Sequence, residues 1–289
     1  MPQPRLPDFL IVGAAKAGTT TLYSYLCKHP SVVMSEPKEP EFFSRGDVWA
    51  RGFDWYKKLF RAADGDTLAG EASTTYTRWP HTEDAAARIA EHLPDAKLVY
   101  ILRHPVERTF SHYGHHVSRF GLDKTFEQAM ADDAIYVDCS LYLMQMQRYL
   151  DRGIRREQFH VVTLDDLKRD PKAVMNGVQA HLGLDLIDLT AGGAEKANER
   201  SSRPFVHGRL RGVVGRIPGA LALAELTPTP LKQAGYWIIE KSPFGRKVKA
   251  KTTPQPMRAE TRQLLLDRFR EPNAELASFL GRDLSMWDQ

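Results

Sequence analysis

The fold follows from one stretch near the start of the chain, Phe9-Leu10-Ile11-Val12-Gly13-Ala14-Ala15-Lys16-Ala17-Gly18-Thr19-Thr20-Thr21-Leu22. Its four leading apolar residues are typical of a strand that is covered on both faces, as in a parallel sheet. Gly13 and Gly18 allow a tight turn and a close approach of a ligand to the backbone, and the threonines favour the start of a helix. We therefore predict a strand, a loop and a helix in immediate succession.

The loop at 13–18 has the chemistry of an anion-binding site. Unpaired N–H groups, the positive end of the helix dipole and the Lys16 ammonium converge on one point, which favours a phosphate. The loop differs from a Walker A sequence, because Thr19 follows Gly18 and the lysine lies inside the loop. A nucleotide kinase or NTPase with an altered loop stays an alternative, as does a plain tight turn that binds nothing.

Apolar runs and helical periodicity alternate along the first two thirds of the chain. We predict further strands at 32–34, 68–72, 97–102 and 159–164. We predict helices at 19–29, 83–92, from Pro105 onward, and at 125–132, 139–151 and 171–182. This alternation indicates a three-layer α/β/α fold with a central parallel sheet, in which ligands bind at the carboxyl ends of the strands.

A chain of 289 residues fits one domain, residues 1–289. Residues 190–256 are irregular, and we expect them to form an acceptor-binding or lid region. Their apolar part at 205–240 could cover a hydrophobic acceptor, contact a membrane surface, form a dimer face or pack into the core. Residues 257–289 are predicted to form a C-terminal amphipathic helix, interrupted near Pro272, and a tail.

Composition and charge narrow the partners. The formal net charge of +4 is too small to indicate nucleic acid by itself. Cys27 and Cys139 are far apart and lack metal-ligand spacing, which suits free thiols in a reducing compartment. With no secretory signal and no transmembrane segment in sight, we expect a cytoplasmic protein without a metal, for which peripheral lipid contact stays possible.

A second segment argues against the kinase alternative. The strand at 97–102 ends in Arg103-His104-Pro105, whereas a Walker B strand ends in an aspartate that holds magnesium. A guanidinium at this place would repel a metal ion, but it can hold a phosphate through two parallel hydrogen bonds.

Three segments in order resemble the PAPS-dependent sulfotransferases, and most of all the branch with the heparan-sulfate sulfotransferase domains and their bacterial relatives. They are Pro7–Leu22, then Lys38-Glu39-Pro40-Glu41-Phe42-Phe43, and then Leu98–Tyr113. The resemblance implies an enzyme that moves the sulfuryl group of PAPS to a hydroxyl or amine of a carbohydrate, lipid or secondary-metabolite acceptor. The product would be 3′,5′-ADP, and no metal would take part. A non-catalytic binder of nucleotide or sulfated glycan is the remaining alternative.

The resemblance also assigns residues to the nucleotide. The 5′-phosphosulfate would lie on the first loop, and the 3′-phosphate would be held by Arg103 and by Ser111, eight residues later. A late loop that covers the nucleotide would contribute Arg246, Lys249 and Lys251. The loop residues assigned in this way are Lys16, Ala17, Gly18, Thr19, Thr20 and Thr21.

For catalysis, the resemblance points to Glu39 and Lys16. Glu39 matches the glutamate that serves as the base, and Glu41 is the nearby alternative. Sulfuryl transfer requires the acceptor to lose a proton as it attacks sulfur, and a carboxylate on a loop stiffened by two prolines can take that proton. We expect this loop to be extended, and we expect Lys16 to neutralise the charge that develops on the departing phosphate.

The chain departs from that branch on the predicted strand at 68–72 and in the late loop at 246–251, which matches it only loosely. Where the branch has Glu-Lys-Ser or Glu-Lys-Thr, this sequence reads Glu71-Ala72-Ser73. The missing lysine leaves the small-molecule or glycan acceptor open.

Overall fold

The computed structural model describes residues 5–191 and 253–289. Five parallel strands form one sheet in the order β2-β3-β1-β4-β5, which confirms the predicted α/β fold with a central parallel sheet. The strands are β1 (Phe9–Gly13), β2 (Val32–Met34), β3 (Leu68–Ala72), β4 (Lys97–Leu102) and β5 (Phe159–Thr163).

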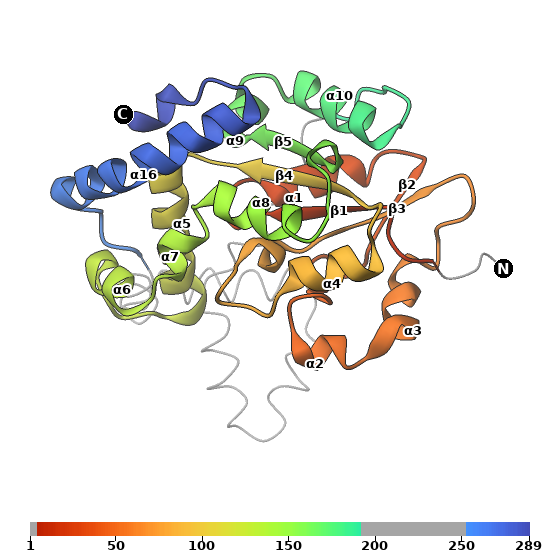
Figure 1. The fold of residues 1–289 in the computed structure, drawn as a ribbon, viewed down its shortest axis with the longest axis horizontal. Coiled ribbons are helices and arrows are strands. Elements are labelled where there is room, and N and C mark those ends of the chain that lie inside the picture. The colour runs from red at the N-terminus through yellow and green to blue at the C-terminus, as the bar shows by residue number, and fades with distance from the viewer. Residues whose placement is uncertain (1–4, 192–252) are drawn as a thin grey trace, which may run out of the picture.

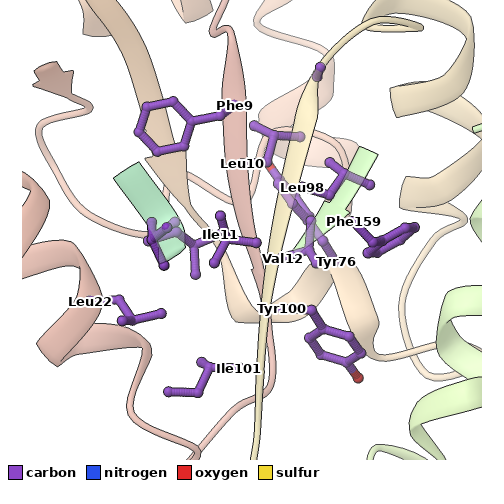
Figure 2. Close-up of a cluster of buried hydrophobic side chains, with 14 of the residues drawn as sticks. Phe9, Leu10, Ile11, Val12, Leu22, Tyr76, Leu98, Tyr100, Ile101 and Phe159 are labelled. Carbon is purple, nitrogen blue, oxygen red and sulfur yellow. The ribbon is translucent and has the colours of Figure 1, made fainter. Parts of the chain in front are cut away.

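Helices cover both faces of the sheet (Figure 1). On one face lie α1 (Thr19–Leu26) and α10 (Pro171–Leu182), and α4 (Ala85–His92) and α8 (Tyr142–Leu150) lie on the other. Side chains of β1 alternate between the two faces, so that Phe9 and Ile11 point one way and Leu10 and Val12 the other (Figure 2). All four are fully buried, as a strand in the middle of a three-layer fold requires.

The remaining helices follow β4 and β5 or flank the sheet. Long α5 (Pro105–Phe120) leaves β4 with a proline at its first turn, where the missing N–H costs nothing. The other elements are α2 (Gly46–Trp49), α3 (Gly52–Lys57), α6 (Phe126–Asp132), α7 (Ile135–Asp138), α9 (Leu164–Arg169) and α16 (Ala259–Leu280), with short 3-10 turns at η1 (Lys58–Phe60), η2 (Thr74–Thr77), η3 (Arg156–Gln158) and η4 (Ser285–Asp288).

Most predicted elements exist within two or three residues of their expected ends, with several exceptions. The short helices α2, α3, α7 and α9 were absent from the sequence prediction, because helices of four to six residues carry too little periodicity to detect. The predicted interruption of the last helix is wrong, because α16 continues through Pro272. Phe269 and Leu276, on either side of the proline, are both buried, so packing against the rest of the protein favours one continuous helix although Pro272 lacks a backbone N–H.

In the stretches 5–191 and 253–289, no helix is both long enough and apolar enough to cross a membrane. The predicted acceptor or lid region at 190–256 falls almost wholly outside the described residues, as does its apolar part at 205–240.

Candidate active site

The first loop turns as its sequence predicts. At Gly13, where φ is 154°, a Cβ atom would lie 2.0 Å from Thr77 Oγ1, so this position admits only glycine. At Gly18, which precedes α1, φ is 105°, and its backbone is likewise left-handed. The N–H of Ala14 donates to the carbonyl oxygen of Ile101 at 2.8 Å, which ties the loop to β4.

Two predicted phosphate-binding segments meet in one cavity of about 420 Å³. Lys16 reaches it from the first loop, Arg103 from the end of β4, and Ser111 from α5. The guanidinium of Arg103 donates through Nη1 to the carbonyl oxygen of Lys16 at 3.2 Å, so the two segments are in direct contact. The cavity is also lined by Glu107, Phe110, Gly114, His115, Ser118 and Pro254.

Cations dominate the electrostatics of this cavity. Burial lowers the pKa of Lys16, and the positive charges of Arg103 and Lys38 lower it further, whereas the negative charge of Glu39 raises it. Desolvation, with Lys16 as the next cause, lowers the pKa of His115 to about 4, so this imidazole is neutral at neutral pH. An anion that entered the cavity would relieve the repulsion between its cations.

The helix α5 presents several groups to the cavity from one face. Ser111, Gly114, His115 and Ser118 follow one another at intervals of three, one and three residues, which places them on one side of a helix. His115 was not among the predicted nucleotide-binding residues, although its spacing of four residues from Ser111 is a signal that could have found it. His112 of the same helix is not among the residues that line the cavity; it is buried beside Arg108, His116 and Tyr136.

Arg103 is held from behind by a tyrosine that the sequence did not single out. The hydroxyl of Tyr142 on α8 donates to the carbonyl oxygen of Arg103 at 2.6 Å and receives the N–H of the same residue at 3.4 Å. Trp287 of η4, which is also buried, packs against the Tyr142 ring with 5.9 Å between the ring centroids. These contacts fix the end of β4 and therefore the point from which the Arg103 side chain leaves.

The loop that carries Glu39 follows β2 and contains no regular helix, as its prolines predict. The expectation of an extended loop is wrong, however, because Glu39 (φ 60°) and Glu41 (φ 55°) both have left-handed backbone. The loop bends there because its backbone docks against the end of β3: the N–H of Glu39 donates to the carbonyl oxygen of Ala72 at 3.0 Å, and that of Glu41 donates to Ser73 Oγ at 3.0 Å.

The two candidate bases have different surroundings. The Glu39 side chain is 40% exposed, pairs with the ammonium of Lys38 at 2.9 Å and accepts a hydrogen bond from Thr74 at 3.4 Å. It lies close enough to Lys16 to act on that residue's pKa. Glu41 is instead paired with Arg45 at 3.3 Å and raises the pKa of Glu71, on the inner side of the loop.

The remaining predicted site residues divide in two. Ala17, Gly18, Thr19, Thr20 and Thr21 form the turn and the first residues of α1, and the N–H of Ala17 donates within the loop to the carbonyl oxygen of Ala14 at 3.2 Å. Their contact with a phosphate stays a prediction. Arg246, Lys249 and Lys251 lie outside the described residues. Within the described part of the chain, no cluster of three histidine, cysteine or acidic side chains is arranged to hold a metal ion.

The fold and the cavity define a parallel α/β protein with a basic pocket at the carboxyl ends of β1 and β4. The family of the sulfotransferase domain matches residues 6–203, which is more than half of the chain. The chain therefore belongs to the sulfotransferase family, whose members transfer sulfuryl groups.

Individual relatives agree with this assignment. The bifunctional heparan sulfate N-deacetylase/N-sulfotransferase 3 of Homo sapiens is 32% identical over 203 residues, which cover 62% of this chain and 22% of that protein. The corresponding enzyme 4 of Mus musculus is 27% identical and aligns with 98% of this chain and 31% of its own length. The chain thus spans about a fifth to a third of these relatives.

A solved structure matches the whole fold. The crystal structure of a sulfotransferase from Alicyclobacillus acidocaldarius superposes with a TM-score of 0.69 at 26% sequence identity, and the match covers 99% of this chain and 100% of that one.

Proposed function

We propose that the protein is a PAPS-dependent sulfotransferase that transfers the sulfuryl group to a hydroxyl or amine and releases 3′,5′-ADP. One observation carries the proposal: Lys16, Arg103 and Ser111, which come from three separate elements, line the same cavity. PAPS bears anionic groups at both ends of its ribose, and a pocket with cations from two neighbouring strand ends suits such a nucleotide.

In this proposal, the 5′-phosphosulfate lies on the first loop beside Lys16, and the 3′-phosphate lies against Arg103 and Ser111. The acceptor oxygen or nitrogen attacks sulfur, the bond from sulfur to the bridging phosphate oxygen breaks, and the acceptor proton passes to Glu39. Lys16 neutralises the charge that appears on the 5′-phosphate of the leaving 3′,5′-ADP. Both carboxylates have a cationic partner, but Glu39 suits the role of base better than Glu41, because Glu39 lies close enough to Lys16 to act on its pKa, whereas Glu41 acts on the buried Glu71.

The names of the relatives suggest the first acceptor to test. Since they are heparan sulfate N-sulfotransferases, we propose a glycan amine, with de-N-sulfated heparan sulfate as its probe. Ala72 stands where the resemblance expects a lysine, and it is completely buried, so any cation that contacts the acceptor must come from another residue. Lys38, which pairs with Glu39, is one cation on the loop that could take this role.

Calorimetric titration tests the nucleotide half of the proposal. We expect the protein to bind 3′,5′-ADP without magnesium and in preference to magnesium-ATP. Lys16→Ala and Arg103→Ala each remove a charge-assisted contact of roughly 1.5–3 kcal/mol, so each should weaken binding about 10-fold to 100-fold.

Arg61→Ala is the matched control, because it removes an exposed positive charge outside the cavity and should leave the affinity unchanged. Preference for magnesium-ATP would instead support a kinase. The proposed catalysis is tested by incubating the protein with labelled PAPS and the glycan and measuring the mass that the glycan gains. Nucleotide binding without transfer to any acceptor would indicate a non-catalytic binder.

A further inference from the structure

A carboxylate that the proposed mechanism does not use lies beneath the Glu39 loop. Glu71 belongs to β3 and is completely buried. The hydroxyl of Tyr56, on α3, donates to Glu71 Oε2 at 2.7 Å. The hydroxyls of Ser73 and Tyr76 also lie beside the carboxylate, where they favour its ionised form, but only the Tyr56 contact has ordinary hydrogen-bond geometry. A buried acid in such a place requires an explanation, because its desolvation costs free energy.

The same two hydroxyls, of Ser73 and Tyr76, hold the backbone of the Glu39 loop. The N–H of Glu41 donates to Ser73 Oγ at 3.0 Å, and the N–H of Phe43 donates to Tyr76 Oη at 3.4 Å. The third docking contact, from the N–H of Glu39 to the carbonyl oxygen of Ala72, needs no hydroxyl. Two of the three backbone contacts that fix this loop against β3 therefore depend on how a hydroxyl is oriented.

Counting protons fixes that orientation. A hydroxyl that accepts a backbone N–H still has its own proton to donate, and it must point that proton elsewhere. The Glu71 carboxylate lies beside both hydroxyls and, when ionised, can only accept. Its Oε1 atom is buried and has no hydrogen-bond partner among the described residues, so it is free to accept these protons. Each hydroxyl that turns toward it would complete a relay from a loop N–H to the hydroxyl and from the hydroxyl to the carboxylate.

We propose that Glu71 is a positioning residue for Glu39: its carboxylate orients the Ser73 and Tyr76 hydroxyls so that both accept the loop backbone and hold Glu39 beside Lys16. The inference rests on the proposed role of Glu39 as the base. Glu71 itself touches neither nucleotide nor acceptor. It acts on the reaction only through the loop.

The loop is also held by apolar packing, which provides a control. The Tyr56 ring stacks on Phe42 with 4.2 Å between centroids and 5° between planes, and Phe42 and Phe43 are both completely buried. Tyr56→Phe therefore removes one hydrogen bond to Glu71 but keeps the packing, and Tyr56 contacts no backbone N–H of the loop in any hydrogen bond recorded for the described residues. Tyr56→Phe therefore shows the effect of disturbing the surroundings of the Glu71 carboxylate while the contacts through Ser73 and Tyr76 are kept.

The first test needs no acceptor. In Glu71→Gln the side chain keeps its size, but its NH₂ group is a donor that opposes the hydroxyl protons. Hydrogen exchange of a peptide that covers Glu41 and Phe43 should speed up at least tenfold in this variant and stay within about threefold of wild type in Tyr56→Phe. Equal protection of the peptide in wild type and Glu71→Gln would overturn the proposal.

The second test measures sulfuryl transfer from labelled PAPS to de-N-sulfated heparan sulfate. Glu71→Gln and Ser73→Ala should each lower kcat about tenfold or more while the KM for PAPS and the affinity for 3′,5′-ADP stay within about twofold, because the phosphate cavity is untouched. Tyr56→Phe should keep kcat within about threefold of wild type. A kcat for both Glu71→Gln and Ser73→Ala equal to that of wild type would refute the positioning role.

A double variant distinguishes positioning from plain loss of structure. If Glu71 acts through Glu39, Glu39→Gln and the pair Glu39→Gln with Glu71→Gln should have the same residual rate. A further drop of the full single-variant factor would show that Glu71 acts independently of Glu39 and would overturn the inference. If wild type transfers sulfate and Glu71→Gln has the same kcat, only this inference is wrong. If wild type shows no transfer at all, the proposed function is wrong, and the inference is wrong with it.

Discussion

The phosphate end and the acid end of the candidate site are built by opposite means. At the phosphate end, cations from the first loop and from the end of β4 crowd into one cavity, and the backbone itself joins them through the contact between Arg103 and the Lys16 carbonyl. At the acid end, Glu39 sits on a loop whose backbone is held by neutral hydroxyls above a buried carboxylate. At the phosphate end, Lys16 and Arg103 repel each other, and an anionic ligand would reduce that repulsion. At the acid end, the contacts determine the position of the Glu39 side chain.

Because the two ends are built differently, substitutions at each end should affect different properties of the protein. Under the proposed function, loss of a cation at the phosphate end should act on nucleotide affinity, because that charge would contact the nucleotide directly. Loss of a group at the acid end should act on the rate of transfer, because Glu39 is proposed to take the acceptor proton rather than to bind a phosphate. If the two ends are independent, a change at one end should leave the property that depends on the other end unaltered.

The largest effect is expected for Glu39→Gln. Removal of a general base typically costs about 10²-fold to 10⁴-fold in kcat, and nucleotide affinity should change by less than about threefold. Transfer rate from labelled PAPS and calorimetric titration of 3′,5′-ADP measure the two quantities on the same preparation.

Glu41→Gln is the control for that variant, since it removes a carboxylate two residues away that pairs with Arg45. Its kcat should stay within about tenfold of wild type. If Glu41→Gln were the more damaging of the two, the base would be Glu41, and the loop would have to present its other carboxylate to the acceptor.

An intermediate effect is expected on the pH dependence of stability. Burial raises the pKa of Glu71 from 4.5 to about 7, against the opposing hydrogen bonds of Tyr76, Tyr56 and Ser73. Between these two pH values the folded state keeps a proton that the unfolded state has released, so the free energy of unfolding should fall as the pH rises through this window. The full shift corresponds to roughly 3 kcal/mol.

Denaturant unfolding of wild type and Glu71→Gln at pH 5 and pH 7.5 measures this slope. The variant should lack most of the decrease, although other groups contribute equally to both proteins. The groups that act on Glu71 from neighbouring elements are Tyr56, Tyr76, Ser73 and Glu41, and Tyr149 feels its charge in turn. Parallel pH slopes in the two proteins would show that Glu71 ionises as easily in the folded state as in the unfolded one.

The smallest effect is expected for Tyr142→Phe. This change removes the hydroxyl that donates to the Arg103 carbonyl oxygen at 2.6 Å but keeps the ring against Trp287. One neutral hydrogen bond is worth about 0.5–1.5 kcal/mol, so we expect 3′,5′-ADP affinity to fall by a few-fold to about tenfold.

Tyr113→Phe removes a similar hydroxyl, whose acceptor is the Lys124 carbonyl oxygen, and should leave affinity unchanged. A fall in kcat without a fall in affinity for Tyr142→Phe would mean that the two ends of the site are coupled through β4.

The phosphate end was the easier one to predict from sequence. The turn at 13–18 depends on two glycines and on residues next to one another in the chain, and the spacing from Arg103 to Ser111 lies on one predicted strand and helix. That both segments share one cavity follows from the adjacency of β1 and β4 in the sheet. Local sequence patterns therefore predicted most residues of the phosphate end. Tyr142 is the exception, because its contact with Arg103 joins residues 39 positions apart.

The acid end could be predicted only in part. The sequence pointed to Glu39 and to a loop without regular helix, but not to its left-handed turns, which arise from docking against β3. That docking joins Glu41 to Ser73 across 32 positions and Phe43 to Tyr76 across 33. No periodicity reports such contacts, and the sequence also gave no sign that Glu71 would be buried rather than simply part of a strand.

The hydrogen bond from Arg103 to the Lys16 carbonyl oxygen sets the distance between the two predicted phosphate-binding segments. Because the protein joins the two segments itself, their separation does not wait for a ligand to draw them together. Under the proposed function, a nucleotide phosphorylated at only one end of the ribose would contact one of these two segments and gain no binding free energy from the other. Discrimination among nucleotides would then be decided by geometry in the free protein, before any lid or acceptor arrives.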